Sequence, residues 1–132
     1  MYGLDTNVLL RYLIGDDARQ AAWAAAFVES HCTADSPCFL NRVVLCEAVW
    51  VLEDAYGYGR PEIAAAVEAV LRTREFQAEN RDQALAALAA YRTEGADFAD
   101  FLIGETNAAS GCDITATFDR KAAATVRFSL VR

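Results

Sequence analysis

The sequence predicts an α/β domain, a three-layer α/β/α sandwich with a largely parallel central sheet. Short apolar segments bounded by turn residues alternate with longer segments in which apolar residues recur every three or four positions. Strands that alternate with helices in this way are typical of parallel sheets. The 132 residues contain no linker, repeat or low-complexity tract, so we expect a single domain over residues 1–132.

The first element is a short apolar lead that runs into a carboxylate. Residues 2–5 predict a buried strand ending at Asp5, and Thr6 or Asn7 is expected to cap a helix over residues 8–14. An acid at the carboxyl end of a first strand lies where open α/β sheets place their ligands.

The later elements follow from the same two patterns. Helices are predicted at residues 18–29, 43–52, 61–73, 81–95 and 97–110, and strands at residues 38–40, 75–79, 113–118 and 126–131. Pro61 fits the first turn of its helix, and Asn41 is expected to cap the helix before it.

Glu47 is the one polar residue in the helix predicted over residues 43–52. Helical spacing places it on a stripe with Val43, Trp50 and Val51, which we expect to be buried. A carboxylate on such a face should be neutral, paired or bound to a cation, because burying an isolated charge is costly. The alternative is that Glu47 lies at the rim of the stripe and pairs with Arg42.

Further acids have structural explanations when taken singly. Asp97 can cap a helix, Asp100 can lie in its first turn, and Asp119 can cap a short helix after a strand. Together with Asp5 and Glu47, however, they suggest one acidic pocket without histidine. Oxygen-only ligands suit Mg²⁺ or Mn²⁺, ions that commonly serve phosphoryl chemistry.

Composition restricts the possible functions. The 12 basic and 19 acidic residues give a net charge of -7, which is unusual for a protein that holds nucleic acid by a basic surface. A nucleic-acid ligand would therefore require bound divalent cations or a local basic patch. The only histidine, His31, argues against HExxH metalloproteases, histidine-rich metal sites and Ser-His-Asp hydrolases.

The four cysteines form no CxxC pair, which argues against zinc ribbons and thioredoxin-like sites. The amino terminus does not have the pattern of a secretory signal, so we expect a cytoplasmic protein whose cysteines are reduced and mostly buried. No apolar run approaches the roughly 20 residues of a membrane helix, so no membrane association is expected.

Four sequence blocks in register carry a resemblance to a known family. They are LDTNVLL at residues 4–10, Glu47 followed by AVWVL, DFAD at residues 97–100, and TFDRK at residues 117–121. In order and spacing they resemble the blocks of PIN-domain nucleases along nearly the whole chain. The sequence is most similar to VapC-type toxins of bacterial toxin–antitoxin pairs.

The resemblance implies roles for particular residues. Asp5, Glu47, Asp100 and Asp119 match the family's catalytic metal-binding acids, and Asp97 matches an accessory acid of the metal site. Asn7 and Thr117 match polar residues that often support the site. Phe101 departs from the family, in which alanine often follows the third acid, and we expect it to reshape the pocket wall.

The implied activity is that of a Mg²⁺- or Mn²⁺-dependent endoribonuclease, in which a metal-activated water hydrolyses RNA phosphodiesters. The resemblance also implies a homodimer and a cognate antitoxin. We expect the antitoxin to place an arginine or lysine near Asp5 and Asp119. We expect an apolar antitoxin helix to cover the surface around Leu10, Leu13 and Trp23.

Two alternatives remain open at the level of sequence. One is a metal-dependent phosphohydrolase acting on a small molecule, although the haloacid-dehalogenase type would normally carry a second aspartate where Asn7 stands. The other is a PIN-like binding module without catalysis, against which the presence of all four principal acids counts. In the nuclease reading, arginines such as Arg11 and Arg42 are expected to contact the RNA backbone.

Overall fold

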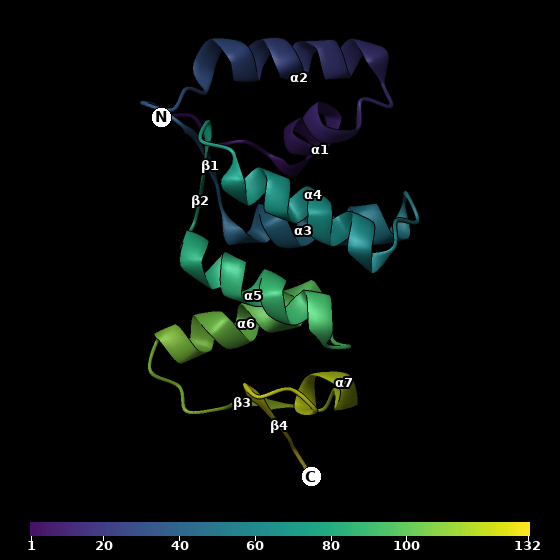
Figure 1. Ribbon diagram of the computed structural model, residues 1–132, viewed down its shortest axis with the longest axis vertical. Coiled ribbons are helices and arrows are strands. Elements are labelled where there is room, and N and C mark those ends of the chain that lie inside the picture. The colour runs from purple at the N-terminus through teal and green to yellow at the C-terminus, as the bar shows by residue number, and fades with distance from the viewer. The chain divides into compact units, whose positions relative to one another are not determined.

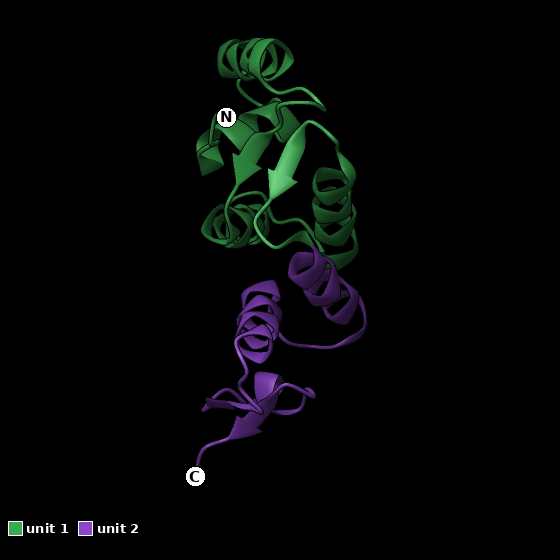
Figure 2. Ribbon diagram, turned by 90° about the vertical axis from the view of Figure 1, so that its left-hand side faces the viewer, with its two compact units in different colours: residues 1–81 green, residues 82–132 purple.

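The computed structural model describes all residues 1–132, which divide into two compact units (Figure 2). Unit 1 is residues 1–81 and unit 2 is residues 82–132. The chain is 59% helical, and its short strands pair in parallel, which confirms the predicted α/β class and the parallel pairing. The three-layer sandwich and the single domain stay predictions. None of the helices is both long and apolar enough to cross a membrane.

The elements follow the predicted order (Figure 1). Unit 1 contains α1 (Thr6–Ile14), α2 (Ala18–His31), β1 (Cys38–Leu40), α3 (Arg42–Asp54), α4 (Arg60–Arg72) and β2 (Phe76–Ala78). Helix α5 (Arg81–Thr93) begins at the boundary, and unit 2 continues with α6 (Phe98–Ala109), β3 (Thr115–Thr117), α7 (Arg120–Ala123) and β4 (Phe128–Leu130).

Unit 1 is built on a pair of parallel strands covered by helices. Residues Cys38 and Leu40 of β1 lie opposite Phe76 and Ala78 of β2. Helix α1 packs against α2 and α3, α3 packs against α4, and α4 packs against β2. The largest fully buried aliphatic side chains of this unit are Leu9, Leu40, Leu52 and Ile63. Their removal from water is the main stabilising term of such a core.

The predicted first strand is much shorter than expected. Only Gly3 forms a bridge, parallel to Phe39 of β1. The Phe39 backbone N–H donates to the Tyr2 carbonyl (2.7 Å), and the Leu4 N–H donates to the Phe39 carbonyl (3.0 Å). These two hydrogen bonds place residues 2–4 beside β1, but the paired segment is limited to a single bridge.

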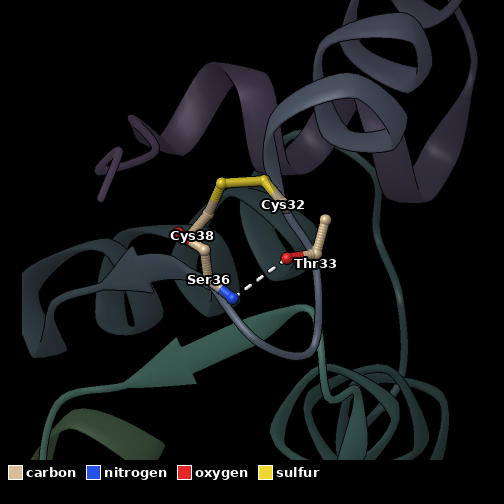
Figure 3. The surroundings of a disulfide bond; sticks show 4 residues. All are labelled: Cys32, Thr33, Ser36 and Cys38. Carbon is tan, nitrogen blue, oxygen red and sulfur yellow. Dashed lines mark hydrogen bonds between the residues drawn. A yellow bond between two sulfur atoms is a disulfide. The ribbon is translucent and has the colours of Figure 1, made fainter.

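The prediction that all cysteines are reduced is wrong for one pair. A disulfide joins Cys32, which follows α2, to Cys38, which begins β1, and their Cα atoms are 5.0 Å apart (Figure 3). The connecting loop turns where the Ser36 N–H donates to Thr33 Oγ1 (2.9 Å). Such a turn can bring two cysteines together without any CxxC spacing. The remaining cysteines are free thiols: Cys46 and Cys112.

In unit 2, helix α6 lies close to the parallel pair of β3 and β4. A Cβ atom on Gly104 would lie 2.8 Å from Phe128 Cε2, so this approach requires glycine. One turn later, Asn107 Nδ2 donates to Thr115 Oγ1 (3.0 Å). These contacts fix the helix that begins with the Asp97–Asp100 block against the strand that leads to Asp119.

Candidate active site

Asp5 itself caps α1, which corrects the expectation that Thr6 or Asn7 would do so. Asp5 Oδ1 accepts a hydrogen bond from the Thr6 N–H (2.8 Å), and the helix starts at Thr6. The capping position leaves the Asp5 carboxylate exposed at the amino end of the helix. An acid is favourable there, because the unpaired N–H groups carry partial positive charge.

Thr6 links the first acid block to Glu47. The Thr6 hydroxyl, whose residue is buried, donates to Glu47 Oε1 across 2.7 Å. Residues 41 positions apart in the sequence are thereby joined. Sequence reasoning missed this role, because it considered Thr6 only as a cap. The sequence feature that could have indicated this role is the hydroxyl side chain directly after the first acid.

Glu47 is exposed, so the expected buried stripe is wrong. Val43 and Trp50, its neighbours on the stripe, are 63% and 62% exposed, whereas Leu45 and Leu52 are buried. Helix α3 is apolar on nearly all sides, so periodicity could not identify the face that packs. Because the Glu47 side chain is in contact with solvent, burial does not require its charge to be neutralised.

The two arginines expected to contact RNA hold acidic partners in unit 1. Arg42 Nε lies 3.3 Å from Glu79 Oε2. The Arg11 guanidinium lies 2.9 Å from Asp16 Oδ1, and the Tyr56 hydroxyl donates to the same carboxylate. Both positive charges are therefore partly neutralised within the protein.

The acids of unit 2 lie around one hollow. Asp97 and Asp100 form a capping box at the start of α6, in which the Asp97 N–H donates to Asp100 Oδ2 (3.3 Å). Both residues line a hollow of about 230 Å³ together with Asp119, Arg120 and Lys121. The structure thus brings together three of the predicted acids and places two cationic residues beside them.

Crowding changes the acidity of Asp100. Burial raises the pKa of this half-buried carboxyl, and repulsion from Asp97 and Asp119 raises it further, against the effect of the Asp97 N–H hydrogen bond. A bound cation would relieve both the desolvation and the repulsion. The raised pKa reports this crowding of negative charge, and the oxygen ligands are those that Mg²⁺ or Mn²⁺ prefers.

Asp119 is positioned by the backbone around it. It caps α7, where its Oδ1 accepts from the N–H groups of Lys121 (2.8 Å) and Ala122 (3.1 Å). The Asp119 N–H donates to Thr117 Oγ1 (3.0 Å). The structure confirms the prediction that Asp119 caps a short helix. Capping uses Oδ1 of Asp119, and Oδ2 has no hydrogen-bond partner.

No group of three or more acids, cysteines or histidine is arranged to hold a metal ion. The predicted acids belong to two sets: Asp5 and Glu47 in unit 1, and Asp97, Asp100 and Asp119 in unit 2. Each set offers carboxylate oxygens alone, and that donor chemistry fits Mg²⁺ or Mn²⁺.

Two residues singled out by the sequence do not line the acidic hollow of unit 2. Phe101 is buried and does not line the acidic hollow of unit 2, so it does not shape the wall of that hollow, and its effect on the predicted four-acid pocket stays a prediction. Its side chain points to the core because Asp97 and Asp100 occupy another face of α6. Asn7 is exposed and lines a separate hollow between α1 and α2, two residues from Asp5.

A family model, that of the PIN domain, matches residues 2–127 of the chain, a range that includes all of these acids. The chain belongs to the PIN domain family. PIN domains have a nuclease-type fold and are generally metal-dependent nucleases. No curated protein and no solved structure matches this PIN domain.

Proposed function

We propose that this PIN domain is a divalent-metal-dependent endoribonuclease, the toxin of a toxin–antitoxin pair acting in the cytoplasm. The observation that carries the proposal is the crowding of Asp97, Asp100 and Asp119 on one hollow, with the raised pKa of Asp100. Like charges held so close are readily compensated by a divalent cation. We also propose that the chain folds as the three-layer α/β/α sandwich predicted from the sequence.

Mg²⁺ or Mn²⁺ would be held by Asp5, Glu47, Asp100 and Asp119, with Asp97 as an accessory acid. When bound, the ion supplies an activated water and stabilises the charge that develops on the phosphodiester.

The chain's own residues orient the acids for this reaction. The Thr6 hydroxyl restricts the rotation of the Glu47 carboxylate, and Thr117 supports the backbone of Asp119. Hydrogen bonds of this kind commonly tune metal ligands.

The expected partners are RNA, a cognate antitoxin and a second copy of the chain. An antitoxin arginine or lysine would neutralise acids at Asp5 or at Asp119. Its apolar helix would contact Trp23 on α2, which is exposed, and the half-buried Leu13. Leu10 is buried, so the surface expected around it is smaller than the sequence suggested.

The decisive experiment incubates purified, antitoxin-free protein with total RNA, with and without Mg²⁺ or Mn²⁺. We expect cleavage only with the ion, and we expect Asp5→Asn to reduce it to the level of a protein-free control. Asparagine caps helices as well as aspartate does, so the variant should keep its fold. His31→Ala serves as a control, because His31 only packs against the rings of Tyr2 and Phe27.

Cleavage that persists in a chelator, or that His31→Ala abolishes, would exclude the metal mechanism. A small phosphate ester hydrolysed much faster than any RNA would indicate the phosphohydrolase. For the toxin role, the product of the neighbouring open reading frame should co-purify with the chain. Absence of such a partner, together with absence of toxicity on expression, would contradict that role.

A further inference from the structure

Helices α1 and α2 enclose a hollow that is separate from the carboxylates. Its volume is about 350 Å³, within the range of small-molecule sites. It belongs entirely to unit 1, and its lining includes Leu4 and Asn7, which lie on either side of Asp5 in the sequence. Its main lining side chains are Asn7, Val8, Gln20, Trp23, Ala24 and Phe27.

The hollow offers an aromatic surface with a positive charge beside it. Trp23 is 62% exposed, and the Arg19 guanidinium carbon lies 5.6 Å from the centroid of its ring. Arg19 forms no ion pair, whereas Arg11 at the same hollow is paired with Asp16. Arg19 therefore presents a positive charge that no carboxylate of the protein neutralises.

The polar groups at the hollow suit a ligand with mixed donors and acceptors. The Asn7 side chain makes no hydrogen bond within the protein, so its amide can both donate and accept. Gln20 Oε1 accepts from Arg11 Nε (2.7 Å), which orients the Gln20 amide group and leaves its NH₂ to donate. A purely apolar small molecule would leave these groups without hydrogen bonds.

We propose that this hollow binds one nucleobase of the RNA substrate, next to the phosphodiester that the acids cleave. The base stacks on Trp23, its edge meets Asn7 and Gln20, and Arg19 contacts a neighbouring phosphate. The subsite rests on the proposed nuclease function and supplies local positive charge to a chain of net charge -7. An antitoxin helix over Trp23 would compete with RNA for it.

A binding experiment without metal tests the subsite independently of catalysis. The sequence contains 2 tryptophans, so Trp50→Phe leaves Trp23 as the only one. In chelator, adenosine or uridine monophosphate should quench the fluorescence of Trp50→Phe in a saturable way, and ribose 5-phosphate should not. The reciprocal variant, Trp23→Phe, keeps only Trp50 and should show no saturable quenching. Equal quenching by ribose 5-phosphate, equal responses of both variants, or no response would overturn the proposal.

A kinetic experiment with a matched control completes the test. Trp23→Ala should raise the KM for RNA about tenfold with little change in kcat, the loss expected from one stacked base. Trp50→Ala should leave both constants unchanged, since Trp50 has the same 62% exposure but lies on α3, outside the hollow. Trp23→Phe should recover part of the loss. If Asp5→Asn abolishes cleavage but Trp23→Ala leaves KM unchanged, the subsite is wrong and the nuclease function stands.

Discussion

The two units hold their acids in different ways. In unit 1, Asp5 and Glu47 are exposed, and Thr6 connects them through its backbone N–H and its hydroxyl. In unit 2, Asp100 is half-buried and shares a hollow with two other acids, which repel its negative charge. Hydrogen bonds orient the acids of unit 1, whereas the acids of unit 2 are held close together although their charges repel one another.

This difference predicts different sensitivities. Carboxylates held by a hydroxyl should lose their orientation when that hydroxyl is removed, with little change in their charge. Crowded carboxylates should instead respond to the removal of one charge and to added cations. Substitutions that preserve shape can separate the two effects.

Among the substitutions that separate the two units, the largest expected effect is that of Thr6→Val on RNA cleavage. Valine fills the same volume but cannot donate to Glu47 Oε1, so the carboxylate is free to rotate into solvent. Loss of a hydrogen bond that supports a metal ligand typically costs about 10–100-fold in activity or metal affinity. Cleavage rates at saturating and limiting Mn²⁺ measure both quantities.

Two controls make this test specific. Thr6→Ser retains the hydroxyl and should retain most of the activity. Thr117→Val should have a smaller effect, because Asp119 keeps its hydrogen bonds from the Lys121 and Ala122 N–H groups. If Thr117→Val is as harmful as Thr6→Val, the two units do not differ in the way described.

The next effect concerns Asp100→Asn in unit 2. The raised pKa means that the folded protein binds a proton more tightly than the unfolded chain does. In chelator the parent therefore loses stability as the pH rises from the ordinary value of 3.8 through the raised pKa. Asp100→Asn keeps the capping shape without this charge, and at neutral pH it should melt at or above the temperature of the parent.

Adding metal should reverse this order. Mn²⁺ at a hundredfold excess over its dissociation constant stabilises the parent by about 2.7 kcal/mol. The Asp100→Asn variant should gain much less. Paired melting curves in chelator and in Mn²⁺ measure both effects. A variant less stable than the parent in chelator, with an undiminished response to Mn²⁺, would identify Asp100 as a helix cap alone, at the roughly 0.5–2 kcal/mol of such caps.

Much of the fold was predictable because its signals are local. The caps at Asn41 and Asp97, the proline at the start of α4, and the strand candidates at residues 38–40 and 75–79 all appear in the structure. The stripe around Glu47 was misassigned because α3 has apolar residues on nearly every side. The Cys32–Cys38 disulfide depends on a loop turn that cysteine spacing does not encode.

The candidate site divides in the same way. Acids at element ends were identifiable from sequence because a helix start favours a carboxylate, but capping alone did not distinguish a structural role from a metal-binding one. The Thr6–Glu47 hydrogen bond and the ion pairs of Arg11 and Arg42 join distant residues, so no local pattern could reveal them. The predicted role of each acid in metal binding stays a prediction.

The smallest expected effect concerns the disulfide, which belongs to unit 1 only. Cys32–Cys38 joins the end of α2 to β1, and β1 in turn holds the segment before Asp5 through its bonds at Phe39. Closing so short a loop in the unfolded chain accounts for about 2 kcal/mol.

Dithiothreitol should therefore lower the free energy of unfolding of the parent by about that amount and reduce the hydrogen-exchange protection of the amides of unit 1. A variant with Cys32→Ala and Cys38→Ala should be unaffected by the reductant, while one with Cys46→Ala and Cys112→Ala should respond like the parent. Equal loss of protection in unit 2 would mean that the two units unfold together. The units would then differ in how they hold their acids, but they would not be independently stable.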